Sequence, residues 1–206
     1  MIPALEALAR LREGNARFVH EVRGRAPVGN TVRRRELEDG QAPFAIILGC
    51  SDSRVPAEIV FDQGLGDLFV IRVAGNIVAP SQVGSVEFAA ARFDVRLVVV
   101  MGHTNCGAIQ ATLEEMGRPS DAQSKNLRAI VDRIRPALEP LKATELVRNP
   151  ERLMHEAGRA NVRASTSHLR HGSEVLEQLI QTNGLLVVGA EYSLATGVVD
   201  FFDGLP

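Results

Sequence analysis

Two short motifs hold both cysteines of the chain: Cys50-Ser-Asp-Ser-Arg54 and Gly102-His-Thr-Asn-Cys-Gly107. They set thiols close to a carboxyl group and an imidazole, and thiolate, imidazole and carboxylate are ligands that zinc takes in proteins. One ion could gather Cys50, His103 and Cys106. Asp52 or a water would then fill the fourth tetrahedral position, and a water on zinc is a hydrolytic reagent.

Arg54 gives the Asp52 carboxylate a partner of its own. A guanidinium can hold a carboxylate in a bidentate pair, which would pull Asp52 off the metal and leave room for water. Taken alone, Ser-Asp-Ser is a common helix-capping string, and His-x-x-Cys is a weak metal signal. The two motifs together favour metal ligation. A redox pair is disfavoured, because Cys50 and Cys106 lie far apart and form no C-x-x-C motif.

The pattern of apolar runs predicts the elements that must position these residues. Short continuous runs bounded by turn residues are typical of strands buried on both faces of a parallel sheet. Such runs lie at 44–48, 68–73, 97–101 and 185–188, with a candidate edge strand at 198–202. Helical stripes lie between them, at 83–93, 106–116, 127–134 and 175–180. We therefore expect an α/β fold, a central mainly parallel β-sheet flanked by helices.

This arrangement brings the two motifs together. Cys50 follows the first run by two residues, and His103 follows the third run by two residues. The carboxyl ends of parallel strands meet at one edge of a sheet, which is where such sheets bind ligands. Cys106 lies three residues beyond His103, at the expected start of a helix, within reach of the same ion.

The N-terminal segment is predicted to form a helical arm over residues 1–35. Apolar residues recur near helical spacing within it, at Leu5, Leu8, Leu11, Phe18 and Val22. Such an arm could pack on its own domain or on a partner subunit, and the pattern does not decide between them. The arginine-rich stretch 31–36 is followed by acidic residues and is interpreted as a solvated helix face.

Composition limits the class of protein. With 206 residues, 45% of them hydrophobic, the chain can form one domain with a substantial core. A net charge of −2 favours neither nucleic acid nor an acidic membrane as a partner. The first residues lack the basic and apolar regions of a signal peptide, and no apolar run approaches the length of a membrane span. Two cysteines build no disulfide framework, and either a single bridge or a reduced pair is possible. The metal interpretation needs the reduced pair, and we expect a protein of the reducing cytoplasm.

The two motifs and the segments around them resemble the β-class carbonic anhydrases. The resemblance extends over separate stretches of nearly the whole chain, at 41–44, 50–58, 67–72, 74–76, 84–88, 102–108, 188–192 and 196–199. It implies one β-carbonic anhydrase-like domain over 1–206 and one Zn²⁺ per subunit on Cys50, His103 and Cys106. Asp52 would be a conditional fourth ligand. The implied activity is the reversible hydration of carbon dioxide to bicarbonate and a proton, by attack of a zinc-bound hydroxide that the Asp52–Arg54 dyad orients.

The resemblance also implies a substrate pocket near a subunit interface. Its family positions fall on Gln41, Phe69, Ala74, Phe88 and the backbone of Gly107. Members of the family are homodimers or assemblies of dimers, so residues of two subunits are expected to complete each site.

Some positions depart from the family pattern. Val73 replaces an asparagine that many relatives carry. Some bacterial relatives bind an inhibitory bicarbonate with a tryptophan, an arginine and a tyrosine. Arg72 and Tyr192 match two of these positions, but Ile47 stands at the tryptophan position.

Two other functions remain open at this point. The same zinc chemistry would suit a hydrolase of carbonyl sulfide or carbon disulfide. A non-catalytic zinc module would instead show four protein ligands and no exchangeable water.

Overall fold

A five-stranded sheet forms the centre of the protein, in a computed structural model that describes residues 2–22, 31–116 and 124–206. The strand order is β2-β1-β3-β4-β5, with the first four strands parallel and β5 antiparallel at the edge. The strands are β1 (Ala45–Gly49), β2 (Leu68–Arg72), β3 (Leu97–His103), β4 (Leu186–Tyr192) and β5 (Val199–Asp203). The predicted fold class is confirmed, and the predicted edge strand is β5.

Two central strands run further than their apolar runs. β3 continues through Gly102 to His103, and β4 continues through Glu191 to Tyr192. His103 pairs in register with Tyr192. The extension places a polar side chain on the last residue of a central strand, so the sheet itself fixes the backbone of His103.

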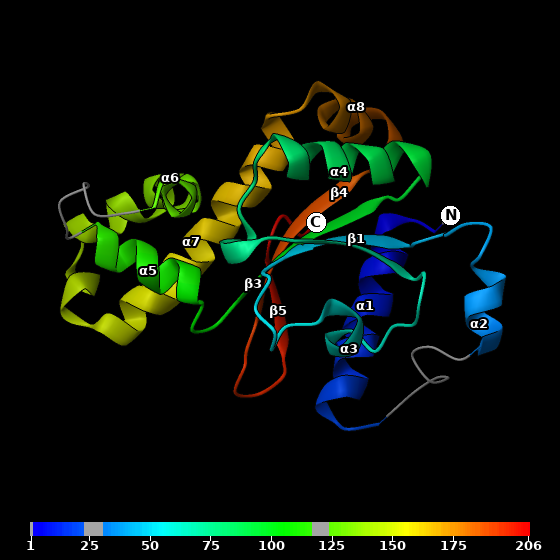
Figure 1. Ribbon diagram of the computed structural model, residues 1–206, viewed down its shortest axis with the longest axis horizontal. Helices are drawn as coiled ribbons and strands as arrows, with labels where there is room; N and C mark the ends of the chain where they lie inside the picture. Colours follow the sequence, from blue (N-terminus) through cyan, green and yellow to red (C-terminus); the bar gives the residue numbers. More distant parts are fainter. Residues whose placement is uncertain (1, 23–30, 117–123) are drawn as a thin grey trace.

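Helices cover both faces of the sheet (Figure 1). They are α1 (Ala4–Val19), α2 (Thr31–Glu36), α3 (Ala57–Val60), α4 (Pro80–Arg92), α5 (Gly107–Glu115), α6 (Lys125–Leu138), α7 (Pro150–His171) and α8 (Glu174–Asn183). Short 3₁₀ turns lie at η1 (Ala74–Asn76), η3 (Glu139–Ala143) and η4 (Glu145–Arg148). In Figure 1, α1 and α3 lie on one side of the sheet, and α4 and α8 on the other.

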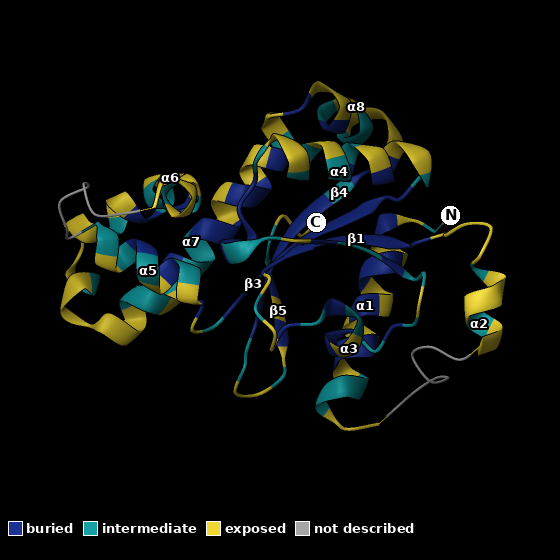
Figure 2. Ribbon diagram, in the orientation of Figure 1, coloured by how far each residue is buried: buried dark blue, intermediate teal, exposed yellow. Residues whose placement is uncertain are grey.

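The strands divide their side chains between two cores, because successive residues of a strand point to opposite faces. Ile47 and Val99 pack in the core under α1 and α3, whereas Ile46 and Val98 pack in the core under α4, α7 and α8. Figure 2 shows the inner strands β1, β3 and β4 buried almost throughout, whereas the edge strands β2 and β5 are partly exposed. A third, smaller cluster surrounds Cys50 and Cys106 and includes side chains of α5 and α6.

Helix α1 packs on its own chain. Ala7, Leu8 and Leu11 are buried in the core that it shares with α3 and the sheet. Leu5 and Val22, which the spacing predicted on the same apolar face, are exposed. The buried face of α1 is therefore narrower than predicted. α2 carries no buried residue, which confirms the solvated interpretation of 31–36.

Helix α7 was not predicted from the apolar pattern. Three of its six buried residues are polar, namely Asn161, Ser165 and Thr166, so a search for hydrophobic stripes does not find it. Among the described residues, no helix is both long and apolar enough to cross a membrane.

Candidate metal centre

Two strand ends and one helix start bring together two thiols and an imidazole. Cys50 follows β1 directly, His103 ends β3, and Cys106 is the N-cap residue of α5. One ligand atom from each lies within 4.8 Å of the others, and all three residues are buried. The Sγ atoms of the two cysteines are 4.0 Å apart, and both cysteines are free. Two sulfurs bound to one tetrahedral zinc at about 2.3 Å each stand about 3.8 Å apart, so this spacing suits a shared ion.

The imidazole of His103 is oriented for ligation. Its Nδ1 lies 2.9 Å from the Thr104 carbonyl oxygen, which fixes Nδ1 as the protonated nitrogen when the ring is neutral. Its Nε2 is buried and has no hydrogen-bond partner among the described residues. Thr104 is itself held to β4, because its N–H donates to the Tyr192 carbonyl oxygen at 3.0 Å. A buried, unpartnered Nε2 facing two thiols is what a metal ligand requires.

The two thiols are coupled through one hydrogen bond between their sulfurs. The hydrogen bond from the Cys106 thiol lowers the pKa of Cys50 to about 4 and raises the pKa of Cys106. Burial is the largest single influence on the pKa of His103 and lowers it, but the contacts with Cys50, the Thr104 carbonyl oxygen and Asp52 together raise it above its ordinary value. A divalent cation would replace the shared proton and stabilise both thiolates, because metal ligation requires deprotonated cysteine.

Asp52 and Arg54 form the bidentate pair expected from the sequence. Arg54 Nε donates to Asp52 Oδ1 at 2.9 Å, and Arg54 Nη2 donates to Oδ2 at 2.7 Å. The side-chain hydrogen bond from Arg54 holds the pKa of Asp52 well below its usual range. Asp52 Oδ2 lies 3.8 Å from His103 Nε2, next to the cluster. The carboxylate thus stays ionised beside the position where an ion would be held.

Arg72 holds the loop formed by the first motif, Cys50–Arg54, a role that the sequence did not reveal. It ends the edge strand β2, and its guanidinium donates to the carbonyl oxygens of Cys50 at 3.0 Å and Asp52 at 2.6 Å. Tyr192 is buried and packs against Phe18. Arg72 could have been linked to this loop only through the register of β1 and β2, where it pairs with Gly49.

The predicted pocket residues fall into two groups. Ala74 lies in η1, next to Gly75, whose N–H donates to Cys50 Sγ at 3.4 Å. Gly107 follows Cys106 directly. These two positions therefore belong to the neighbourhood of the metal centre.

The other three predicted pocket residues lie towards the opposite end of the sheet. Phe69 pairs with Ile46 near the start of β1, about 13 Å before Cys50 at the usual rise of a strand. Phe88 packs against Phe69, with ring centroids 6.2 Å apart. Gln41 is exposed and precedes β1. One chain therefore does not bring Gln41, Phe69 and Phe88 to its own metal centre.

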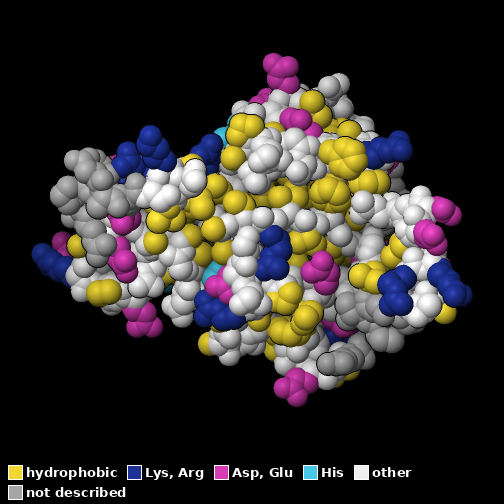
Figure 3. Space-filling view, in the orientation of Figure 1, with side chains coloured by type: hydrophobic (Ala, Val, Ile, Leu, Met, Phe, Trp, Pro, Cys, Tyr) yellow, Lys and Arg dark blue, Asp and Glu magenta, His cyan; other side chains and the backbone are white. Residues whose placement is uncertain are grey.

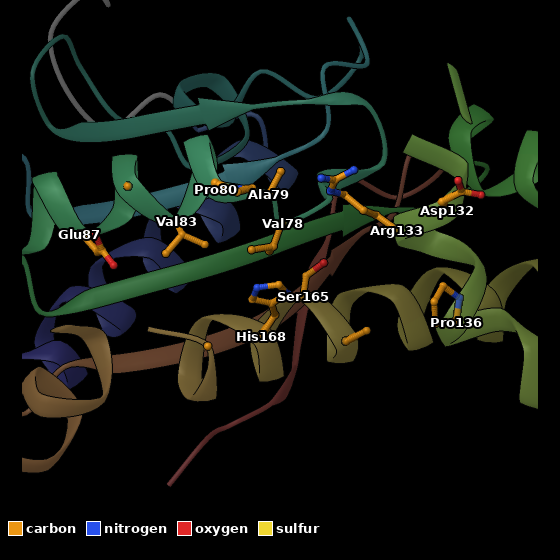
Figure 4. A pocket seen from close by; sticks show the side chains of 13 residues that line it. Val78, Ala79, Pro80, Val83, Glu87, Asp132, Arg133, Pro136, Ser165 and His168 are labelled. Atoms are coloured by element: carbon orange, nitrogen blue, oxygen red, sulfur yellow. The ribbon is translucent and has the colours of Figure 1, made fainter. Parts of the chain in front are cut away.

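A separate cavity of about 730 Å³ lies between α4, α6 and α7 (Figure 4). Its walls are mainly apolar, and its polar side chains are Glu87 of α4, Asp132 and Arg133 of α6, and Ser165 and His168 of α7. None of the predicted site residues lines it. The cavity is distinct from the metal centre.

The sheet and the cluster at its carboxyl edge define an α/β protein with a candidate metal centre of two thiols and one imidazole. Residues 45–199 match the family model described as carbonic anhydrase. The chain belongs to the β-carbonic anhydrase family, a family of enzymes whose general reaction is the hydration of carbon dioxide.

Individual relatives agree with this assignment. A carbonic anhydrase of Mycolicibacterium smegmatis is 37% identical over 190 residues, which cover 92% of this chain and 89% of the relative. Carbonic anhydrase 2 of Mycobacterium tuberculosis is 37% identical over 187 residues, covering 91% and 87%. The solved β-carbonic anhydrase CafA of Aspergillus fumigatus has a TM-score of 0.75 at 27% identity, covering 98% of this chain and 91% of that one. A structure of tetrameric β-carbonic anhydrases from Sordaria macrospora shares the fold, with a TM-score of 0.72 at 23% identity.

Proposed function

We propose that this protein is a zinc-dependent carbonic anhydrase that hydrates carbon dioxide reversibly to bicarbonate and a proton. The observation that carries the proposal is the buried cluster of Cys50, His103 and Cys106, with ligand atoms within 4.8 Å of one another. The unpartnered Nε2 of His103 supports it, since a buried polar atom without a partner is costly unless a ligand satisfies it. Two soft thiolates and an imidazole favour zinc over the hard cations.

The three side chains would hold zinc and leave its fourth position open. When bound, zinc would lower the pKa of a water molecule to about 7 and so supply a nucleophile at neutral pH. Among the described residues, Asp52 is outside the group of three ligands, and both of its oxygens accept hydrogen bonds from Arg54. This favours a solvent-accessible fourth position over ligation by Asp52, and it speaks against a purely structural site with four protein ligands.

Asp52 would accept a hydrogen bond from the nucleophile and thereby orient it towards the substrate. Arg54 keeps the carboxylate ionised and aimed, because its bidentate contact leaves the group no free rotation. The Gly107 N–H, at the start of α5, would donate to the oxygen on which negative charge develops. Ala74 would present an apolar surface to carbon dioxide beside this donor.

A second subunit would supply Gln41, Phe69 and Phe88. These residues lie at the far end of β1 and β2 from the chain's own metal centre, so they can line a metal centre only across an interface. We propose a homodimer, or an assembly of dimers, in which this end of each chain's sheet lines the metal centre of the partner. Gln41 would then donate a hydrogen bond to the substrate oxygen from the partner's side.

The surface around β2 suits such an interface. Within the described parts of the chain, β2 is an edge strand with β1 as its only neighbour in the sheet, and Phe88 on α4 is 54% exposed. Ile59 on α3 and Leu65 are exposed on the other side of the strand. On the face of the molecule seen in Figure 3, hydrophobic side chains gather across the middle. An exposed apolar patch beside an unpaired strand edge is typical of a subunit interface.

Stopped-flow hydration of carbon dioxide tests the proposed function, with zinc content measured on the same sample. We expect turnover that scales with zinc content and is lost on chelation. Zinc-loaded protein without hydration activity would contradict the proposal, and faster turnover of carbonyl sulfide or carbon disulfide in parallel would reassign the substrate. The free thiols suit a reducing compartment, and we place the protein in the cytoplasm.

A further inference from the structure

Helix α7 holds the turn that faces the sulfur of Cys50. Asn161 Nδ2 donates a hydrogen bond to the Gly75 carbonyl oxygen at 2.8 Å, and Ser165 Oγ donates to the Asn76 carbonyl oxygen at 3.0 Å. Asn161 is 1% exposed and Ser165 is 5% exposed. The two side chains lie one helical turn apart, so they hold two successive carbonyl groups of η1 from the same side.

The same turn contacts the candidate metal centre. The Gly75 N–H donates to Cys50 Sγ at 3.4 Å in a buried contact. Gly75 has a φ of 68°, and a Cβ at this position would lie 2.8 Å from Ile134 Cδ1 and 3.0 Å from Ala108 Cβ. The turn is thus confined between α5, α6 and α7, and the direction of its N–H depends on these neighbours.

We propose that Asn161, supported by Ser165, is a positioning residue for the metal centre. By holding η1 it aims the Gly75 N–H at Cys50 Sγ and so limits the charge that this thiolate donates to a bound metal. The inference rests on the proposed zinc site and extends it beyond the ligands. A hydrogen bond to a thiolate withdraws charge from it, so the loss of the bond leaves the sulfur a stronger donor and the metal a weaker acid.

A purely structural role for Asn161 predicts a different result. In that case removal of the Asn161 side chain would weaken the packing of α7 on η1 and lower the melting temperature. It would leave the electronic state of the bound metal unchanged. Thr166 offers a matched control on the same helix. It is fully buried, and its Oγ1 contacts the Arg163 carbonyl oxygen and Asp203 rather than the turn.

The test uses the full chain with Co²⁺ in place of zinc, because the thiolate-to-cobalt charge-transfer band reports how strongly sulfur donates. We expect the band of Asn161→Ala to move to longer wavelength, and that of Ser165→Ala to move less in the same direction. Zinc affinity, measured by competition with a chelator, should fall about tenfold in Asn161→Ala, because the cost of a turn that no longer holds Cys50 in place exceeds the gain from the stronger thiolate, as for other residues that support metal ligands. Thr166→Val should lower the melting temperature without moving the band.

Several results would overturn the proposal. A folded Asn161→Ala protein with the wild-type band and zinc affinity would do so, as would an equal band shift in Thr166→Val. If Asn161→Ala does not fold, Ser165→Ala decides, and an unmoved band overturns the proposal. A wild-type protein without any thiolate-to-cobalt band would instead refute the zinc site itself, so the two failures are distinguishable.

Discussion

Arg54 holds the Asp52 carboxylate at three points. Its Nε and Nη2 donate to the two carboxylate oxygens at 2.9 and 2.7 Å, and its backbone N–H also donates to Oδ1 at 2.9 Å. Oδ2 remains 3.8 Å from His103 Nε2. The pair therefore places an ionised carboxylate beside the cluster of Cys50, His103 and Cys106, with both of its oxygens engaged by Arg54.

Removing the guanidinium should release Asp52 to bind the metal. In Arg54→Ala we expect the carboxylate to become the fourth ligand, with turnover at least about tenfold lower because the group no longer orients the nucleophile. Arg54→Lys keeps the charge but cannot form the bidentate contact, so its loss should be smaller. A crystal structure of zinc-loaded Arg54→Ala together with stopped-flow assays checks both points. A free Asp52 and wild-type turnover would contradict them.

Replacing Cys106 by alanine should remove zinc and activity together. The ligand set would fall to one thiolate and one imidazole, which holds zinc weakly at neutral pH. Zinc content measured by atomic absorption should fall below about a tenth per chain in dialysed protein, and stopped-flow hydration should fall with it. Ser53→Ala, an exposed change in the adjacent motif, is the control and should keep both. Full activity without zinc in the Cys106 variant would refute the ligand assignment.

The chemistry at the strand ends could be predicted because it follows from local rules. Cys50 and His103 end neighbouring parallel strands, and the register of a parallel sheet aligns such ends. The Asp52–Arg54 contact lies within one turn of chain, so spacing alone suffices to predict it. The strand ends follow from the hydrophobic pattern, whereas the Asp52–Arg54 contact follows from the short spacing of the two residues alone.

The remaining parts depend on contacts that the pattern does not encode. α7 buries Asn161 and Ser165 against η1, and polar residues in the interior give no hydrophobic signal. Asn149 before Pro150 is the sequence feature that could have indicated its start, since Asn149 caps the helix through the Arg152 N–H. The role of Arg72 depends on the fold of the loop that follows β1, which no periodicity describes.

Glu191 should make stability depend on pH. Its carboxyl group is buried near the end of β4, and burial raises its pKa, although His155 and Arg159 favour its charged form. Asp200 and Glu156 add to the increase. The folded protein therefore binds this proton more tightly than the unfolded chain does. This contribution to stability is fully present below the ordinary pKa of about 4.3 and is lost as pH rises through the raised pKa.

The variant Glu191→Gln stays uncharged at every pH and should avoid this loss. We expect the melting temperature of the variant to rise relative to that of the wild type as pH increases from about 4 to 7. The expected difference is about 2–4 °C for each kcal/mol of unfolding free energy that the wild type loses. Thermal denaturation across this range checks the sign. Glu13→Gln, at an exposed position of α1, controls for the loss of one charge. A melting temperature that falls further below the wild type with rising pH would show that the contacts with His155 and Arg159 dominate instead.

Mixed dimers should recover activity that neither parent has. A Cys106→Ala chain lacks the metal but keeps Gln41, whereas a Gln41→Ala chain keeps the metal but offers its partner no glutamine. If Gln41 serves the neighbouring subunit, each heterodimer has one complete site. Random pairing of equal amounts then gives about a quarter of wild-type activity, since half of the dimers are mixed and each has one working site of two. Co-expression with two tags isolates the mixed species for stopped-flow assay.

Cys106→Ala paired with Arg54→Ala is the matched control. Both changes damage the metal side of a chain's own site, so no mixed dimer of these two chains has a complete site. Recovery in the control, or its absence in the Gln41 pair despite stable heterodimers, would show that Gln41 does not act across the interface.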